Sequence, residues 1–140
     1  MSLWTLQQVN DEVQRLRSIL HGKPVAWADF GIDEDFGSSH VRIDDRYHWI
    51  AMERGQECAH QATDDVDELL YWIISSNAVG TAGRWEMEHR HPTDDFRRLY
   101  FARAVELLAR VKPEWAARQQ AEWDEVLARH PFVDGGAGTA

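Results

Sequence analysis

The sequence predicts an α+β fold: an N-terminal helix, a four-stranded antiparallel meander sheet, and then three C-terminal helices packed on one sheet face. Two observations support this prediction. Apolar residues recur every three or four positions near both ends of the chain but alternate in the middle. The strands also follow one another in a run, which is typical of α+β proteins. Since no repeat or linker interrupts the 140 residues, we expect one domain over residues 1–134 and a flexible tail over 135–140.

The first predicted helix covers residues 3–21. Ser2 is a candidate N-cap, and Gly22 followed by Pro24 is a typical stop signal. The residues expected to face the core follow helical spacing and are Leu6, Val9, Val13, Leu16 and Leu20.

The four strands are predicted over residues 25–30, 40–44, 47–53 and 57–62. Large apolar side chains on both faces of the third strand favour a central place in the sheet. Asp45-Arg46 is a candidate tight turn. Arg54-Gly55-Gln56 is a candidate hairpin turn, in which Gly55 supplies a positive φ.

Three further helices complete the prediction. The second helix follows Thr63-Asp64-Asp65 and ends near residue 79, before Gly80 and Gly83. Residues 85–90 fit either a continued helix or an extended connector. The third helix opens at residues 92–94 and ends near 111. The fourth begins at Pro113, because proline suits the first turn of a helix.

The net charge of −9 is concentrated in one segment of the chain. Residues 29–68 contain twelve acidic residues and three arginines, whereas acids and bases balance in the remainder. Such a segment repels phosphate backbones, so direct nucleic-acid binding is disfavoured. It attracts a basic protein partner and accelerates their encounter. The plain alternative is that the acidic residues serve solubility alone.

Cysteine usage and hydropathy favour a soluble cytoplasmic protein. Cys58 has no second cysteine with which to pair, which is typical of a reducing compartment. No apolar run approaches the ~20 residues that a membrane span requires.

The histidines and paired acids carry weak catalytic signals. His89 and His91, with nearby carboxylates, are the runner-up hypothesis of a small metal-binding protein or enzyme, but no accompanying zinc motif is present. His48 and His60 are predicted on adjacent strands, where they could face each other. A catalytic pair with Cys58 is less favoured than a structural cysteine. We therefore expect no enzyme activity, no catalytic residue, no metal and no cofactor.

Several sequence blocks between Tyr47 and Phe132 together resemble the immunity protein 63 family of bacterial polymorphic-toxin systems. These blocks are Tyr47-x-Trp49, Glu53-Arg54-Gly55-Gln56-Glu57, residues 63–73, Asp95-Phe96-Arg97-Arg98, Phe101, Leu107-Leu108, Trp115, Arg118 and Pro131-Phe132. The resemblance implies a non-catalytic protein that binds and neutralises a cognate toxin. It also implies that Asp95 starts a helix and that Arg97 or Arg98 pairs with Glu68 or Asp65.

The charge asymmetry locates the expected toxin interface. A basic toxin such as a nuclease would meet an acidic surface that mimics its phosphate substrate. Besides the immunity protein and the metal-binding protein or enzyme, a third possible function is that of a structural subunit with an internal partner. The residues predicted to bind the toxin are Asp33, Glu34, Asp35, Asp44 and Asp45.

Overall fold

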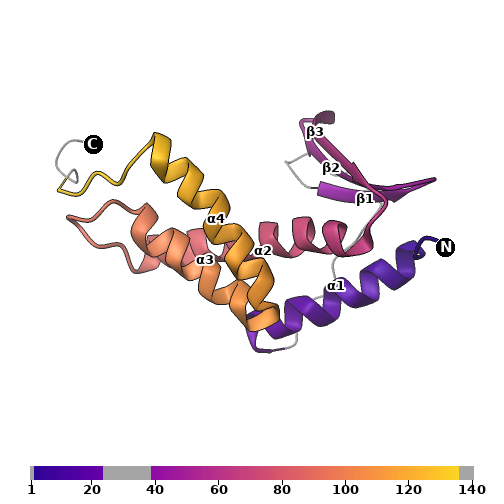
Figure 1. Ribbon diagram of the computed structural model, residues 1–140, viewed down its shortest axis with the longest axis horizontal. Coiled ribbons are helices and arrows are strands. Elements are labelled where there is room, and N and C mark those ends of the chain that lie inside the picture. The colour runs from indigo at the N-terminus through magenta and orange to yellow at the C-terminus, as the bar shows by residue number, and fades with distance from the viewer. Residues whose placement is uncertain (1, 24–38, 136–140) are drawn as a thin grey trace. The chain divides into compact units, whose positions relative to one another are not determined.

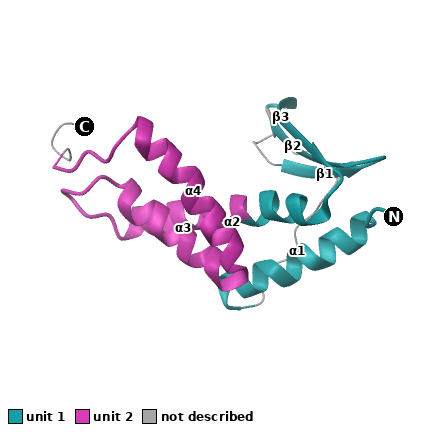
Figure 2. Ribbon diagram, viewed as in Figure 1, with its two compact units in different colours: residues 1–74 teal, residues 75–140 magenta. Residues whose placement is uncertain are grey.

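The computed structural model describes residues 2–23 and 39–135 (Figure 1). The chain divides into two compact units, residues 1–74 and 75–140 (Figure 2). The single domain over residues 1–134 stays a prediction. None of the described helices is long and apolar enough to cross a membrane. The elements are α1 (Leu6–His21), β1 (Ser39–Ile43), β2 (Tyr47–Glu53), β3 (Gln56–Thr63), α2 (Val66–Glu88), α3 (Arg97–Val111) and α4 (Pro113–Arg129).

The α+β class is confirmed, with differences in detail. The described strands form a three-stranded antiparallel sheet in the order β1-β2-β3. The additional strand predicted over residues 25–30 lies outside the described residues. The predicted layer of three C-terminal helices on one sheet face also differs from the structure. There, α3 and α4 belong to the second unit, where they pack on each other as an antiparallel pair (Figure 1).

Helix α1 begins three residues later than predicted, at a capping box. Thr5, not Ser2, is the N-cap: its hydroxyl accepts from the Gln8 backbone N–H, and the Gln8 side chain accepts from the Thr5 N–H. Gly22 ends the helix with φ +69°, as its position predicts. Val9, Val13, Leu16 and Leu20 of the predicted stripe are buried, whereas Leu6 is partly exposed.

The sheet follows the predicted strands closely, and β2 lies at its centre. Antiparallel pairing sets Tyr47 opposite both Ile43 and Thr63. The two-residue turn between β2 and β3 consists of Arg54 and Gly55, with φ of +53° and +76°. Positive φ at both central positions defines the type I′ turn that suits tight hairpins. The large buried side chains of the sheet are Val41, Tyr47, Ile50 and Met52.

Helix α2 is longer than predicted, since it passes through Gly80 and Gly83 and ends at Glu88. A buried stripe explains this continuity: residues at steps of four, from Leu70 and Ile74 through Ala78, Ala82 and Glu86, remain buried. Gly83 lies beneath the Tyr100 ring, where an added Cβ would sit 3.5 Å from Tyr100 Cε1. Tertiary packing therefore outweighs the helix-breaking tendency of glycine.

Within the second unit, aromatic rings fill the space between α3 and α4. The rings of Phe101 and Trp123 stack with centroids 4.0 Å apart, and Tyr100 packs against both. Leu107, Leu108 and Trp115 supply buried apolar surface. Phe96 lies at the N-cap of α3 and is 48% exposed.

Asp95 fastens the start of α3 to the segment after α4. Its carboxylate accepts from the backbone N–H groups of Arg97 and Val133 and pairs with the Arg97 guanidinium at 2.8 Å. Arg97 also donates to the carbonyl oxygens of His130 and Pro131. The helix-start role of Asp95 thus agrees with the structure.

A second ion pair runs parallel to the first. Arg98 pairs with Asp134 at 2.6 Å, and Asp134 accepts from the Asp95 N–H. The structure thus pairs Arg97 with Asp95 and Arg98 with Asp134, where Glu68 or Asp65 was the predicted partner. Asp95 is two residues from Arg97 in the sequence, and Asp134 lies in the segment after α4.

Gly55, in a turn with positive φ, and Gly80, inside helix α2, give the first prediction. Gly55→Ala should destabilise the protein by about 1–2 kcal/mol, because a Cβ is disfavoured at positive φ. Gly80→Ala should stabilise it by about 0.5–1 kcal/mol, because Gly80 is exposed in a helix and a Cβ would meet nothing within 4 Å. Denaturant unfolding of both variants measures the difference, and equal effects would contradict the turn geometry.

The contacts of Asp95 give the second prediction. Its side chain is 8% exposed, so Asp95→Asn should cost about 2 kcal/mol of unfolding free energy through weakened charge-assisted hydrogen bonds. Asp124→Asn on the exposed face of α4 is the matched control and should change stability by less than about 0.5 kcal/mol. A loss for Asp95→Asn no larger than that of the control would contradict this assignment.

Acid stability gives the third prediction. The Arg97 side chain and the backbone N–H groups of Val133 and Arg97 hold the pKa of Asp95 well below its usual range, and Arg98 lowers the pKa of Asp134. A carboxyl with a lowered folded pKa contributes stability that is present above its unfolded value of roughly 3.9 and is lost as pH falls through the folded value. Urea midpoints should therefore fall steeply below about pH 4. The Asp95→Asn variant should show a shallower decline, and an unchanged slope would count against the proposed cause.

Candidate functional site

Five exposed carboxylates gather where the sheet meets α2, and we call them the acidic end of the sheet: Asp44, Asp45, Asp64, Asp65 and Asp67. The first two lie in the β1–β2 turn, and the others lie at the junction between β3 and α2. The pairing of Tyr47 with Thr63 brings the two segments together. An ion pair of 2.8 Å between Arg46 and Asp64 joins them directly.

Local hydrogen bonds hold these acids in place. Asp44 accepts from the Arg46 backbone N–H at 3.0 Å, and one of its oxygens lies 2.7 Å from His48 Nε2. These contacts, the Arg46 N–H foremost, hold the pKa of Asp44 well below its usual range. Asp65 accepts from the Asp67 N–H at the start of α2. That helix end favours negative charge through its dipole.

The acidic end of the sheet keeps an excess of negative charge. Two arginines lie beside it: Arg46 pairs with Asp64, and Arg42 lies 3.9 Å from Asp44. Five carboxylates therefore face two guanidinium groups. Both arginines and all five acids are exposed, so the field of this surface extends into solvent.

A groove of about 610 Å³ lies beside Asp44, between the residues before α1 and strand β1. The Trp4 backbone N–H donates to the Tyr47 hydroxyl at 2.7 Å, which anchors the N-terminal wall to the sheet. The groove combines apolar and polar walls, and its lining residues are Leu3, Trp4, Thr5, Leu6, His40, Val41, Arg42, Ile43 and Asp44.

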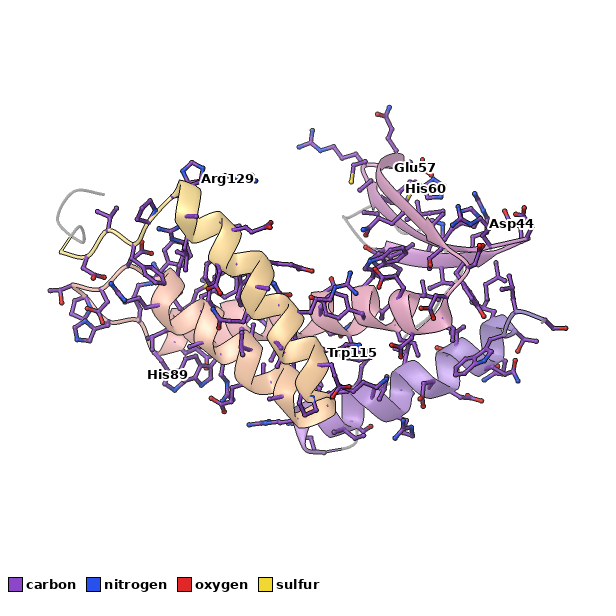
Figure 3. All side chains as sticks on the ribbon, viewed as in Figure 1. Asp44, Glu57, His60, His89, Trp115 and Arg129 are labelled. Atoms are coloured by element: carbon purple, nitrogen blue, oxygen red, sulfur yellow. The ribbon has the colours of Figure 1, made fainter. Side chains whose placement is uncertain are left out.

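A continuous row of polar groups crosses from the β1–β2 turn to the β2–β3 hairpin. His48 Nδ1 lies 2.8 Å from His60 Nε2, so the prediction that these histidines face each other is confirmed. Asp44 lies at the outer nitrogen of His48, and Glu57 Oε2 lies 3.4 Å from His60 Nδ1. Figure 3 shows His60 and Glu57 on the hairpin and Asp44 toward the other end of the strands. Cys58 is exposed, and its thiol donates to the Ala51 carbonyl at 3.4 Å.

The structure brings together two of the five residues predicted to bind a toxin. Asp44 and Asp45 are adjacent and exposed, whereas residues 33–35 lie outside the described residues. Sequence reasoning counted Asp64 and Asp65 in the acidic segment but interpreted them as helix caps, with Asp65 also a candidate partner of Arg97 or Arg98, and left them out of the predicted toxin-binding residues. The signal was present, because a hairpin register through Gly55 sets Tyr47 near Thr63.

His89 and His91, the residues of the metal-binding alternative, have local partners. His89 stacks on Trp85 and contacts its carbonyl oxygen at 2.8 Å. His91 Nδ1 lies 3.6 Å from Asp94. Among the described residues, the one group of three or more acidic, histidine or cysteine ligands close enough to share an ion is Asp44, Asp45 and His48.

The comparisons with known proteins identify the class to which this fold and surface belong. The chain matches the family model described as Immunity protein 63 over residues 44–125, which is more than half of its length. The comparisons with curated proteins and with solved structures found no significant match. This places it among the immunity proteins. The chain belongs to the immunity protein 63 family, as its sequence blocks predict, and the match includes the whole acidic end of the sheet.

Proposed function

We propose that this protein binds a cognate toxin and neutralises it without catalysis, using the acidic end of the sheet as the centre of the interface. The observation that carries the proposal is the gathering of five exposed carboxylates from two separate segments of the chain. Family membership supplies the expectation of a toxin partner. The field of this surface selects a basic one.

The chemistry of the surface suits a toxin with a basic cleft. Carboxylates held by neighbouring N–H groups present fixed negative charges, as phosphate groups do along a nucleic acid. A nuclease toxin would meet these charges with the lysines and arginines that otherwise bind its substrate. Such complementarity accelerates association and disfavours wrong partners.

The groove beside Asp44 supplies the apolar part of the interface. Aromatic residues in well-packed pockets dominate binding energy, whereas rim charges mainly affect association rates. Trp4 is half-buried, and its backbone is fixed by the Tyr47 hydroxyl. A toxin side chain that enters this groove would contact both Trp4 and Asp44.

We place the protein in the cytoplasm, where it would protect the producing cell.

The direct test is co-expression of this protein with the product of the neighbouring gene, followed by affinity capture. Survival of the cells together with a stable complex is the expected result. A toxin that kills the cells regardless and does not bind this chain would overturn the proposal.

The acidic end of the sheet gives the fourth prediction. Asp45→Lys and Asp67→Lys together should weaken toxin binding at least tenfold, chiefly through a slower association rate that depends on salt. Asp124→Lys with Glu125→Lys on α4 makes the same change in net charge on exposed residues and should leave the affinity near that of the wild type. Surface plasmon resonance at two salt concentrations separates these outcomes. Equal losses for the two variants would show that only net charge matters.

A further inference from the structure

The row of four groups that links Asp44, His48, His60 and Glu57 has no role in the proposed toxin interface beyond Asp44. It lies across β2 and β3, with 12% of the His48 side chain and 31% of the His60 side chain exposed. The contacts between neighbours are 2.7, 2.8 and 3.4 Å. The row is thus partly sheltered but open to solvent from one side.

Two contacts of this row are hydrogen bonds, and the third is the approach of Glu57 Oε2 to His60 Nδ1 at 3.4 Å; the row has one proton fewer than its three contacts when both imidazoles are neutral. Three contacts require three protons, but two neutral imidazoles carry only two, and ionised carboxylates carry none. When the N–H groups lie on the outer nitrogens, they point to the carboxylates of Asp44 and Glu57. The inner nitrogens, His48 Nδ1 and His60 Nε2, then direct their lone pairs at each other across 2.8 Å. A cation between them removes this repulsion.

We propose that His48 and His60 bind a divalent transition-metal ion through these inner nitrogens. Imidazole suits zinc, copper and nickel. Histidines that bind metals almost always donate their other N–H to a carboxylate, a carbonyl or water, and here Asp44 and Glu57 occupy those positions. Zn–N bonds of about 2.0–2.1 Å at a tetrahedral angle separate two nitrogens by roughly 3.3 Å. A small rotation of either ring provides this distance.

The proposed ion would join neighbouring strands and keep its other coordination positions for water or an added donor. Two protein ligands make the site weaker than a zinc site with three or four. Because the ion binds the folded strands, it should also raise the unfolding temperature. The proposal does not depend on toxin binding, and it is tested on the chain alone, so its failure and that of the proposed function are distinguishable.

The test is calorimetric titration of the purified, tag-free and chelator-treated protein with Zn²⁺ and with Cu²⁺. One equivalent of each should bind, with Cu²⁺ the tighter. His48→Gln with His60→Gln should abolish this binding. The matched control is His89→Ala with His91→Ala, which removes two exposed histidines and should leave the affinity unchanged. Far-UV circular dichroism without metal verifies that each variant is folded.

Two further measurements fix the position of the ion. Asp44→Asn and Glu57→Gln should each weaken binding about 10–100-fold, as outer-shell changes do. The electron paramagnetic resonance spectrum of the Cu²⁺ form should show two coordinated nitrogens. The proposal is overturned if the histidine variant binds metal like the wild type, or if no metal binds and the pair holds a shared proton instead. It is equally overturned if Asp45→Asn abolishes binding while His60→Gln does not, because the ion would then lie on Asp44, Asp45 and His48.

Discussion

The register of β2 against β3 is the constraint on which the functional half of the chain depends. The Arg54-Gly55 turn sets Glu53 opposite Gln56, and a one-residue bulge at Cys58 then shifts the pairing, so that Ala51 lies opposite Ala59. Side chains alternate between the two faces of a strand, so this single residue decides which groups meet. Without the bulge, His60 would lie opposite Trp49 and on the other face from His48. With it, His60 lies opposite Ile50, on the same face as His48.

The same register assembles the acidic end of the sheet. It sets Tyr47 opposite Thr63, which brings the β1–β2 turn beside the start of α2 and allows Arg46 to reach Asp64. A buried Tyr47 fixes this position, because its hydroxyl also accepts from the Trp4 N–H. In the second unit, Asp95 joins two segments of the chain, as Tyr47 does in the first. Its carboxylate satisfies N–H groups at the start of α3 and after α4, thereby closing the aromatic helix pair.

Local patterns in the sequence predicted the elements whose cause is local. Strand β2, the Gly22 stop, the positive φ of Gly55 and the proline at the start of α4 all follow from residue chemistry within a few positions. The length of α2 could not be predicted in this way, because Ala78, Ala82 and the buried Glu86 support the helix through packing. The site divides similarly. Asp44 and Asp45 were visible as a charge pair, and the hairpin turn at Gly55 places them near Asp64. The bulge that sets His60 on the same face as His48, however, has no clear sequence signal. Residues 33–35 lie outside the described residues.

Asp44 belongs both to the acidic end of the sheet and to the histidine row, and this double membership has a physical consequence. A surface carboxylate ordinarily loses side-chain freedom when a partner binds it, which reduces the net affinity. Asp44 has already lost much of that freedom, because the Arg46 N–H and His48 Nε2 both contact its Oδ1 in the free protein. A basic partner therefore meets a preorganised charge. Any ligand that fixes the His48 ring, including the proposed metal ion, should preorganise Asp44 further. The strand register thus couples two surfaces that the sequence separates, through the one carboxylate that they share.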